Sequence, residues 1–242
     1  MQAILYVAHG TRVKKGVEEA IQFLEETKKE INISIQETAF LELVEPDILQ
    51  GIKNCVKSGA TNIVISPILL LAANHVKKDI PLEIDKARAI YPHLNITIGQ
   101  PLGIHDKLIE TIYKRIIEQK LEILPEAEVL LIGRGSSDVA VVQSMKEIAN
   151  LLKKRFGFRA VNTCFLYGAG PSFEETIQYI KQYDTKQTFI VPYLLFSGLL
   201  RNGIQKKIQE LELDSASIVL CDSVGYDKNV RDVLIERVHE VI

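Results

Sequence analysis

The sequence contains the same pattern twice, about 125 residues apart, and this duplication restricts the folds that the chain can adopt. Residues 6–12 (YVAHGTR) align with 131–137 (LIGRGSS), and residues 39–46 (AFLELVEP) align with 164–171 (CFLYGAGP). The runs ISPILLL and IVPYLLF keep the same offset, and TIGQPLG aligns with VLCDSVG after a small deletion. Several matches at a nearly constant offset predict two units of similar fold.

Each copy alternates short apolar runs with segments of helical periodicity. In the first copy, QAILYVA, ISIQETAFLE, TNIVISPILLL and LNITIG have the length and apolar content of strands. Helices are predicted between them, from the apolar stripe that includes Val17 and Leu24, from Pro46 onward, and over residues 79–91 and 107–118. This alternation predicts an α/β fold in which each unit is a mostly parallel open sheet with helices on both faces.

The boundary between the copies is predicted within KLEILPEAE, around Leu124 and Pro125. We therefore expect an N-terminal domain at residues 1–124 and a C-terminal repeat at residues 125–242. Whether the terminal helix of each copy packs on its own half or crosses to the other half stays open at this stage. Because the chain already contains both copies of the unit, we expect it to be a monomer.

The composition is that of a globular protein without a nucleic-acid surface. Of the 242 residues, 25% are charged, the formal net charge is −2, and basic residues are interspersed with acidic ones. No apolar run reaches the roughly 20 residues of a membrane span, and no signal peptide is evident, so a cytoplasmic protein is expected. The three cysteines (Cys55, Cys164 and Cys221) lie far apart and are expected to be buried thiols, not disulfides or zinc ligands.

Three ionisable residues of the first copy are not repeated in the second. The aligned pairs are His9 with Arg134, Glu42 with Tyr167, and His75 with Leu199 or Leu200. Because the apolar pattern of the second copy matches without the three ionisable residues, packing does not require them. This asymmetry predicts a functional site in the first half of the chain.

His9 and Glu42 end the first and second predicted strands, and His75 follows the third. The carboxyl ends of parallel strands meet at one edge of a sheet, where ligands bind. Imidazole nitrogens of His9 and His75 suit iron, cobalt or zinc, and histidine and glutamate side chains accept protons near neutral pH. A single histidine at a strand end is more often a structural polar residue, so the interpretation depends on the three residues together. Glu45 is an alternative to Glu42.

Other histidines and motifs indicate weaker sites. His93, His105 and His239 are expected in a turn, at a helix start and near the C-terminal surface. GRGSSD at residues 133–138 lacks the third glycine of a dinucleotide-binding loop and the acidic residue after the next strand. GTRVKKG lacks the Lys-Ser/Thr pair of a phosphate-binding loop. AHGTR differs from the histidine phosphatase motif, which has an arginine where this chain has Ala8.

Three longer motifs are more specific. They are VAHGTR at residues 7–12, FLELVEP at residues 40–46, and the run from Pro67 to Pro81 that contains LLLAANHV. Together they resemble the class II tetrapyrrole chelatases, including those that insert iron or cobalt into sirohydrochlorin, and the similarity extends through LIGRGSSD and FIVPYLLFSG. The resemblance implies ATP-independent insertion of a divalent metal into sirohydrochlorin, with Fe²⁺ favoured over Co²⁺ and release of the pyrrole protons.

The resemblance also implies roles for residues of this sequence. It implies metal binding by His9 and His75, and catalysis by these histidines and Glu42. The residues implied to contact the macrocycle are Glu45, Leu70, Leu71, Ala72, Ala73 and Asn74. The metal is then a substrate, and no permanently bound cofactor is expected. The alternative from a different class is a metal or tetrapyrrole carrier that uses the same ligands without turnover.

Overall fold

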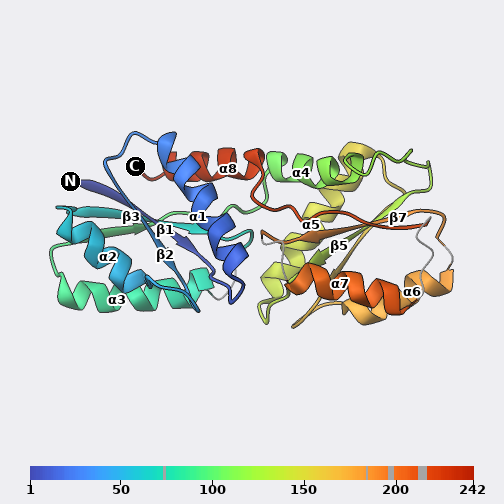
Figure 1. The fold of residues 1–242 in the computed structure, drawn as a ribbon, viewed down its shortest axis with the longest axis horizontal. Helices are drawn as coiled ribbons and strands as arrows, with labels where there is room; N and C mark the ends of the chain where they lie inside the picture. Colours follow the sequence, from blue (N-terminus) through green and yellow to red (C-terminus); the bar gives the residue numbers. More distant parts are fainter. Residues whose placement is uncertain (73–74, 184, 196–198, 212–216) are drawn as a thin grey trace. The chain divides into compact units, whose positions relative to one another are not determined.

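The two copies fold into two parallel four-stranded sheets of the same topology (Figure 1). The computed structural model describes residues 1–242 except 73–74, 184, 196–198 and 212–216, and it does not describe the side chains of His75 and Tyr183. The first sheet has the strand order β2-β1-β3-β4 and the second has the order β6-β5-β7-β8. The strands are Gln2–Ala8 (β1), Ile35–Phe40 (β2), Asn62–Ile68 (β3), Asn95–Ile98 (β4), Glu128–Gly133 (β5), Ala160–Phe165 (β6), Thr188–Tyr193 (β7) and Ile218–Leu220 (β8).

The two sheets also share their register. Ala8 of β1 pairs with Phe40 of β2, and Gly133 of β5 pairs with Phe165 of β6. The offset between the copies is therefore the same on both strands (133 − 8 = 125 and 165 − 40 = 125). The predicted duplication and the parallel α/β class are confirmed.

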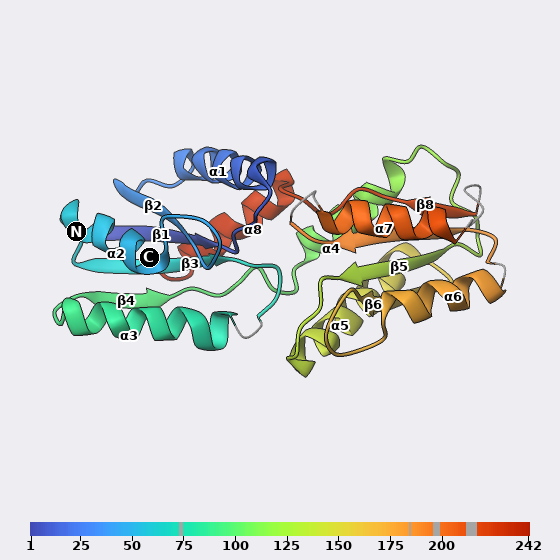
Figure 2. The same cartoon turned by 60° about the horizontal axis from the view of Figure 1, so that its bottom comes forward.

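Helices cover both faces of the first sheet (Figure 2). On one face, α1 (Lys14–Lys29) contacts α8 (Lys228–His239); on the other, α2 (Ile48–Lys57) contacts α3 (Ile80–Ile90), which follows the short π-helical turn η1 (His75–Asp79). The core under α2 and α3 includes Leu5, Val7, Ile52, Ile84 and Ala87. Because both faces are covered, β1 is buried over almost its whole length, as its unbroken apolar run predicts.

The second sheet is covered in the same way. On one face, α4 (Asp106–Ile117) contacts α5 (Val139–Phe156). On the other, α6 (Phe173–Tyr183) and α7 (Leu199–Glu210) contribute Phe173, Ile177, Ile180 and Ile204 to a core that contains Leu130 and Ile132 of β5. Each unit is thus a complete three-layer α/β structure.

The terminal helix of each copy packs on the sheet of the other copy. The helix α4 follows β4 in sequence but belongs to the second unit, whereas α8 follows β8 but contacts β3 and α1 of the first unit. The compact units are therefore Met1–Gly103 with Lys228–Ile242, and Ile104–Asp227. The boundary near Leu124 belongs to the sequence repeat, and it differs from the boundaries of the compact units because the helices are exchanged.

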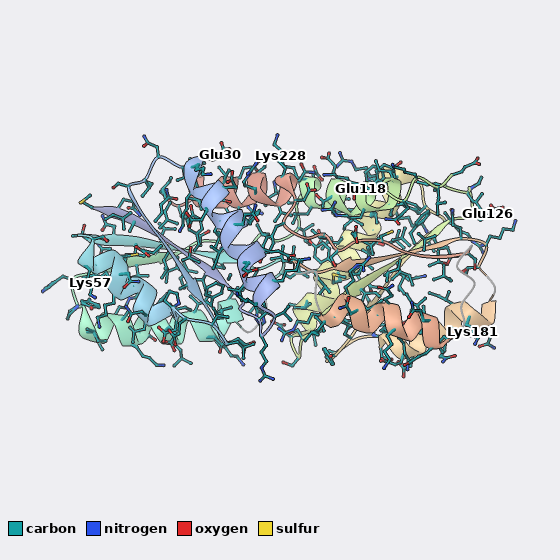
Figure 3. The ribbon with its side chains drawn as sticks, viewed as in Figure 1. Glu30, Lys57, Glu118, Glu126, Lys181 and Lys228 are labelled. Carbon is teal, nitrogen blue, oxygen red and sulfur yellow. The ribbon has the colours of Figure 1, made fainter. Side chains whose placement is uncertain are left out.

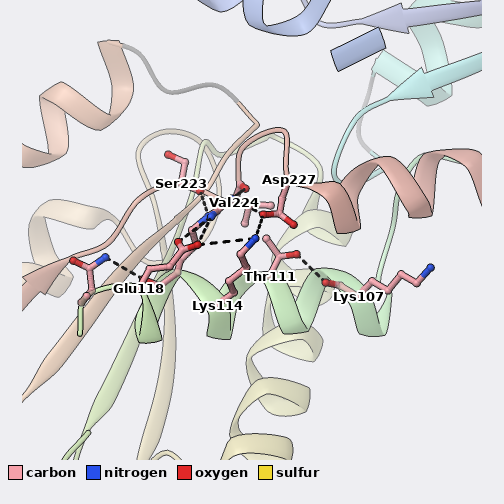
Figure 4. Close-up of polar contacts among 9 residues, drawn as sticks. Lys107, Thr111, Lys114, Glu118, Ser223, Val224 and Asp227 are labelled. Atoms are coloured by element: carbon pink, nitrogen blue, oxygen red, sulfur yellow. Dashed lines mark hydrogen bonds and ion pairs between the residues drawn. The ribbon is translucent and has the colours of Figure 1, made fainter. Parts of the chain in front are cut away.

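Polar contacts hold α4 in the second unit (Figure 4). The Arg115 guanidinium donates to the carbonyl oxygens of Ser223 and Val224, each at 2.8 Å, and to the Asp227 carboxylate at 3.1 Å. Nζ of Lys114 donates to the same carboxylate at 2.6 Å. The Asp227 side chain is only 6% exposed, so two cations neutralise a buried carboxylate.

The corresponding arginine holds α8 in the first unit. The Arg237 guanidinium donates to the Leu102 carbonyl oxygen at 3.2 Å and contacts Glu240 at 2.7 Å, as Arg115 contacts Glu118 at 2.9 Å in α4. In each unit, an arginine therefore fixes the exchanged helix to the loop after the last strand of the sheet that this helix covers.

The surface carries charges of both signs. Charged side chains at or near element ends in both units are labelled in Figure 3: Glu30, Lys57, Glu118, Glu126, Lys181 and Lys228. Many pairs lie one helical turn apart, such as Lys28 with Glu25 at 2.7 Å. In the described parts of the chain, no helix has the length and apolarity that crossing a membrane requires.

Replacing Asp227 by Asn is expected to lower the free energy of unfolding by about 1–3 kcal/mol, because Lys114 and Arg115 would keep their charges without the buried counter-ion. Glu118→Gln is the matched control, because Glu118 contacts the same two cations from the surface, and its loss should cost less than about 1 kcal/mol. Chemical denaturation of the three proteins measures both effects. Equal losses in the two variants would contradict the role of the buried carboxylate.

Candidate functional site

The loops after β1 and β2 continue the pairing of these strands beyond their last residues. The amide of Leu41 donates to the Ala8 carbonyl oxygen at 2.9 Å, and the amide of Glu42 donates to the His9 carbonyl oxygen at 3.2 Å. His9 and Glu42 therefore lie side by side at the carboxyl edge of the first sheet, where the sequence analysis expected them.

His9 and Glu42 also meet through their side chains. Nδ1 of His9 lies 3.4 Å from Oε1 of Glu42. The imidazole is 14% exposed and the carboxylate is 44% exposed, so one member of the pair is largely enclosed and the other faces solvent. A carboxylate beside one ring nitrogen orients an imidazole, as at many metal-binding histidines. The pair can therefore bind a metal ion, and it can also pass a proton to solvent.

Gly10 allows the two loops to approach each other this closely. Its φ angle is +90°, and a Cβ atom at this position would overlap the carbonyl oxygen of Glu42. Gly135 has a φ angle of +108° at the equivalent position of the second unit, where a Cβ atom would overlap the carbonyl oxygen of Tyr167. The glycine after His9 and the glycine after Arg134 thus serve the backbone in the same way, and the repetition of this glycine in the sequence was the signal for this role.

His75 begins η1, the single π-helical turn that leads into α3. Such turns are rare and occur often at functional sites. The side chain of His75 lies outside the described part of the chain, so its expected meeting with His9 stays a prediction. Among the described side chains, no group of three His, Cys, Asp or Glu residues is arranged to hold a metal ion.

The segment implied to contact the macrocycle connects β3 to η1. Leu70, Leu71 and Ala72 are partly buried in this connection. Ala73 and Asn74 lie outside the described residues. The described part of the segment therefore offers apolar side chains that are neither fully buried nor fully exposed.

Glu45 occupies a different place from Glu42. Its carboxylate accepts from the amide of Asp47 at 3.2 Å, and the Asp47 carboxylate in turn accepts from the amide of Gln50 at 2.7 Å and caps α2. Of the two glutamates that the sequence left as alternatives, Glu42 is therefore the one paired with His9. The role of Glu45 toward a ligand stays a prediction.

A cavity of about 370 Å³ lies beside Glu42, between the loop that precedes α2 and the start of α3. Its lining combines apolar, acidic and basic side chains: Leu41, Glu42, Ile48, Asp79, Leu82, Glu83 and Lys86. Asp79 and Leu82 line the cavity but were not predicted from the sequence. Asp79 could have been found, because it lies four residues after His75, whereas no sequence pattern distinguishes Leu82.

The second unit keeps the backbone arrangement without the imidazole. The amide of Tyr167 donates to the Arg134 carbonyl oxygen at 3.1 Å, as Glu42 does to His9. Tyr167 and Arg134 are both exposed. The alignment of these residues with Glu42 and His9 is therefore correct in three dimensions, and the second unit presents a cation and a phenol at the equivalent edge.

The remaining histidines and the cysteines occupy structural positions. His105 caps α4, since its Nδ1 accepts from the amide of Lys107 at 3.2 Å. His93 lies in the turn between α3 and β4, and His239 is the exposed last residue of α8, as predicted. The three thiols are free and buried, and burial raises the pKa of each to about 12 (Cys55, Cys164 and Cys221). These thiols are therefore poor metal ligands and poor nucleophiles near neutral pH.

Comparison with known proteins identifies a family whose model matches both copies of the repeat. The model of the CbiX family matches the chain twice, over residues 3–119 and 128–241. The chain belongs to the CbiX family. The two matches correspond to the two copies of the sequence repeat.

Curated relatives and solved structures are similar to almost the whole chain. Sirohydrochlorin ferrochelatase of Priestia megaterium is 41% identical over 242 residues, covering 100% of this chain and 91% of that protein. Sirohydrochlorin cobaltochelatase of the same organism is 32% identical, covering 99% and 80%. The solved structure of SirB from Bacillus subtilis with Fe³⁺ has a TM-score of 0.91 and 43% identity, covering 99% of this chain and 94% of that one. The resemblance to the chelatases is thus confirmed.

Gly10→Ala and Gly135→Ala are each expected to lower the free energy of unfolding by about 2–4 kcal/mol, because the added methyl group overlaps a backbone oxygen as well as straining φ. Gly59→Ala is the matched control, since its φ is +91° but the nearest atom to an added Cβ is the Met1 sulfur, 3.6 Å away. This control should lose only about 1 kcal/mol. Chemical denaturation compares the three, and a control as unstable as Gly10→Ala would refute the contact with Glu42.

Proposed function

We propose that this CbiX-family protein inserts Fe²⁺ into sirohydrochlorin without ATP. The observation that carries the proposal is the His9–Glu42 pair, which lies at the sheet edge of a chain 41% identical to a sirohydrochlorin ferrochelatase. The incoming divalent ion replaces the protons of the pyrrole nitrogens and changes no oxidation state. The reaction therefore needs a metal ligand and a proton acceptor, and the pair supplies one of each.

The site residues divide these tasks. His9 and His75 bind the ion, since neutral imidazole suits Fe²⁺ and Co²⁺, and the pyrrole nitrogens replace its remaining water. Glu42 or one of the histidines accepts the pyrrole protons. The exposure of the Glu42 carboxylate supports its passing protons on to water.

The macrocycle contacts residues 70–74 and Glu45, and cationic groups pair with the carboxylates around its rim. The cations closest in sequence to the site loops are Arg12, Lys14, Lys15, Lys77, Lys78 and, in the second copy, Arg134. Lys14 and Lys15 approach Glu18 and Glu19 of α1 at 3.6 and 4.0 Å. Arg134 is favoured because it is exposed at the position of His9 and, as a permanent cation, it pairs with carboxylates but does not bind metals.

Iron is favoured because the ferrochelatase of Priestia megaterium is more similar to this chain than the cobaltochelatase of the same organism, at 41% against 32% identity. Cobalt insertion is the second candidate, since imidazole ligands suit both ions. A carrier of metal or tetrapyrrole would use the same ligands but would stop after one equivalent. No permanently bound cofactor is part of the proposal.

The proposal is tested by mixing sirohydrochlorin with Fe²⁺ or Co²⁺ and the protein under anaerobic conditions and following the visible spectrum. We expect many turnovers per protein molecule, with Fe²⁺ the better substrate. His9→Ala should lower kcat by at least about 100-fold, because the pair loses its metal ligand. A spectral change that stops at one equivalent would identify a carrier.

Arg134→Ala is the matched variant in the second unit. It should raise KM up to about tenfold and change kcat less, because it removes a carboxylate partner and no reacting group. A loss of kcat equal to that of His9→Ala would show that the chemistry is not confined to the first unit. Thermal melts of both variants confirm that the comparison concerns folded proteins.

We also propose that the protein acts as a cytoplasmic monomer, without a nucleic-acid or membrane partner. The mixed surface charge and the presence of both repeats in one chain support this proposal. Light scattering at low concentration should give a mass near 27.2 kDa. A mass near twice that value would contradict it.

A further inference from the structure

Leu43 has a backbone conformation that is uncommon for leucine. Its φ angle is +66°, in the left-handed region that favours glycine. Among the described non-glycine residues, Lys120 is the other one with a positive φ, at +56°. Lys120 lies two residues after Glu118, the C-cap of α4, and its amide still donates to the carbonyl oxygen of Ile117, the last residue of that helix, whereas Leu43 lies in the loop between β2 and α2. A helix end therefore explains Lys120 but not Leu43.

The second unit makes the equivalent turn with glycine. Gly168, 125 positions after Leu43, has a φ angle of +81° (168 − 43 = 125). A Cβ atom on Gly168 would lie 2.5 Å from the carbonyl oxygen of Ser136. The turn itself thus requires no side chain, and the first unit carries a leucine where glycine would be less strained.

Packing does not explain the leucine either. Its side chain is 54% exposed, although it follows Glu42 directly in the sequence. Leu82, which lines the cavity beside Glu42, is also exposed. Leu43, in the loop that carries Glu42, and Leu82, near the start of α3, therefore both present apolar surface to solvent. A strained residue that contributes little to the core is often retained because its side chain serves a ligand.

We infer that Leu43 contacts the face of the tetrapyrrole ring and positions the macrocycle over the His9–Glu42 pair. This inference rests on the proposed function and adds a substrate-positioning residue to it. A tetrapyrrole has a broad apolar face and a charged rim, so it combines an apolar contact near its centre with the cationic partners of its carboxylates. The exposed leucine provides the apolar contact one residue from Glu42.

The test is the affinity of metal-free sirohydrochlorin for the whole protein, measured by spectroscopic titration, with a thermal melt of each variant. Leu43→Gly and Leu43→Asn should raise Kd by about tenfold, because both remove the apolar contact. Both should keep or raise the melting temperature, because glycine and asparagine accept a positive φ more readily than leucine. Leu43→Met should retain most of the affinity, since it preserves the apolar area.

Ile90→Asn is the surface control, because Ile90 is 57% exposed at the far end of α3 and should not alter Kd. Unchanged Kd in both Leu43→Gly and Leu43→Asn would overturn the inference. A lower melting temperature in both would also overturn it, because Leu43 would then serve the fold. If the wild-type protein does not bind sirohydrochlorin at all, the proposed function fails first, and the two failures are thereby distinguished.

Discussion

The hydrogen bond from the Glu42 amide to the His9 carbonyl oxygen fixes the geometry on which the site depends. It extends the parallel pairing of β1 and β2 into their loops, and Gly10 permits the close approach that the bond requires. Once the two backbones are held in this way, the side chains of His9 and Glu42 meet at the edge of the sheet. The placement of the His9 imidazole beside the Glu42 carboxylate is thus a property of two neighbouring strands and one glycine.

The second unit has the same backbone arrangement without the histidine and the glutamate, so the arrangement does not depend on these two side chains. Tyr167 and Arg134 are joined by the same bond, and Gly135 makes the same close approach. The backbone at this edge of the sheet is therefore the same in both copies, whereas the side chains that it carries differ. Within one chain, the edge of one sheet carries the histidine and glutamate that we propose react, and the edge of the other carries an arginine suited to a carboxylate.

The sequence predicted the features that depend on local pattern. The parallel sheets follow from unbroken apolar strands between amphipathic helices, and the positions of His9 and Glu42 follow from the rule that strand ends meet at one edge. The exchange of α4 and α8 could not be predicted, because duplicated sequences give each helix two similar sheets to cover. Arg115 and Arg237 even offer equivalent anchors. The left-handed conformation of Leu43 also leaves no mark in the local sequence, since leucine rarely adopts it.

The exchange of helices also has a consequence for the order in which a ribosome can complete the molecule. The second unit is one continuous stretch, Ile104–Asp227, and every element of it has been synthesised before α8 emerges. The first unit needs Lys228–Ile242, which follow the whole second unit in the chain, to cover one face of a sheet whose strands all precede that unit. Domains generally fold as units during synthesis, so the N-terminal unit must wait with part of one apolar face, the part beside α1, uncovered. Of the two units, the one that contains His9 therefore begins to be translated earlier but completes its fold later.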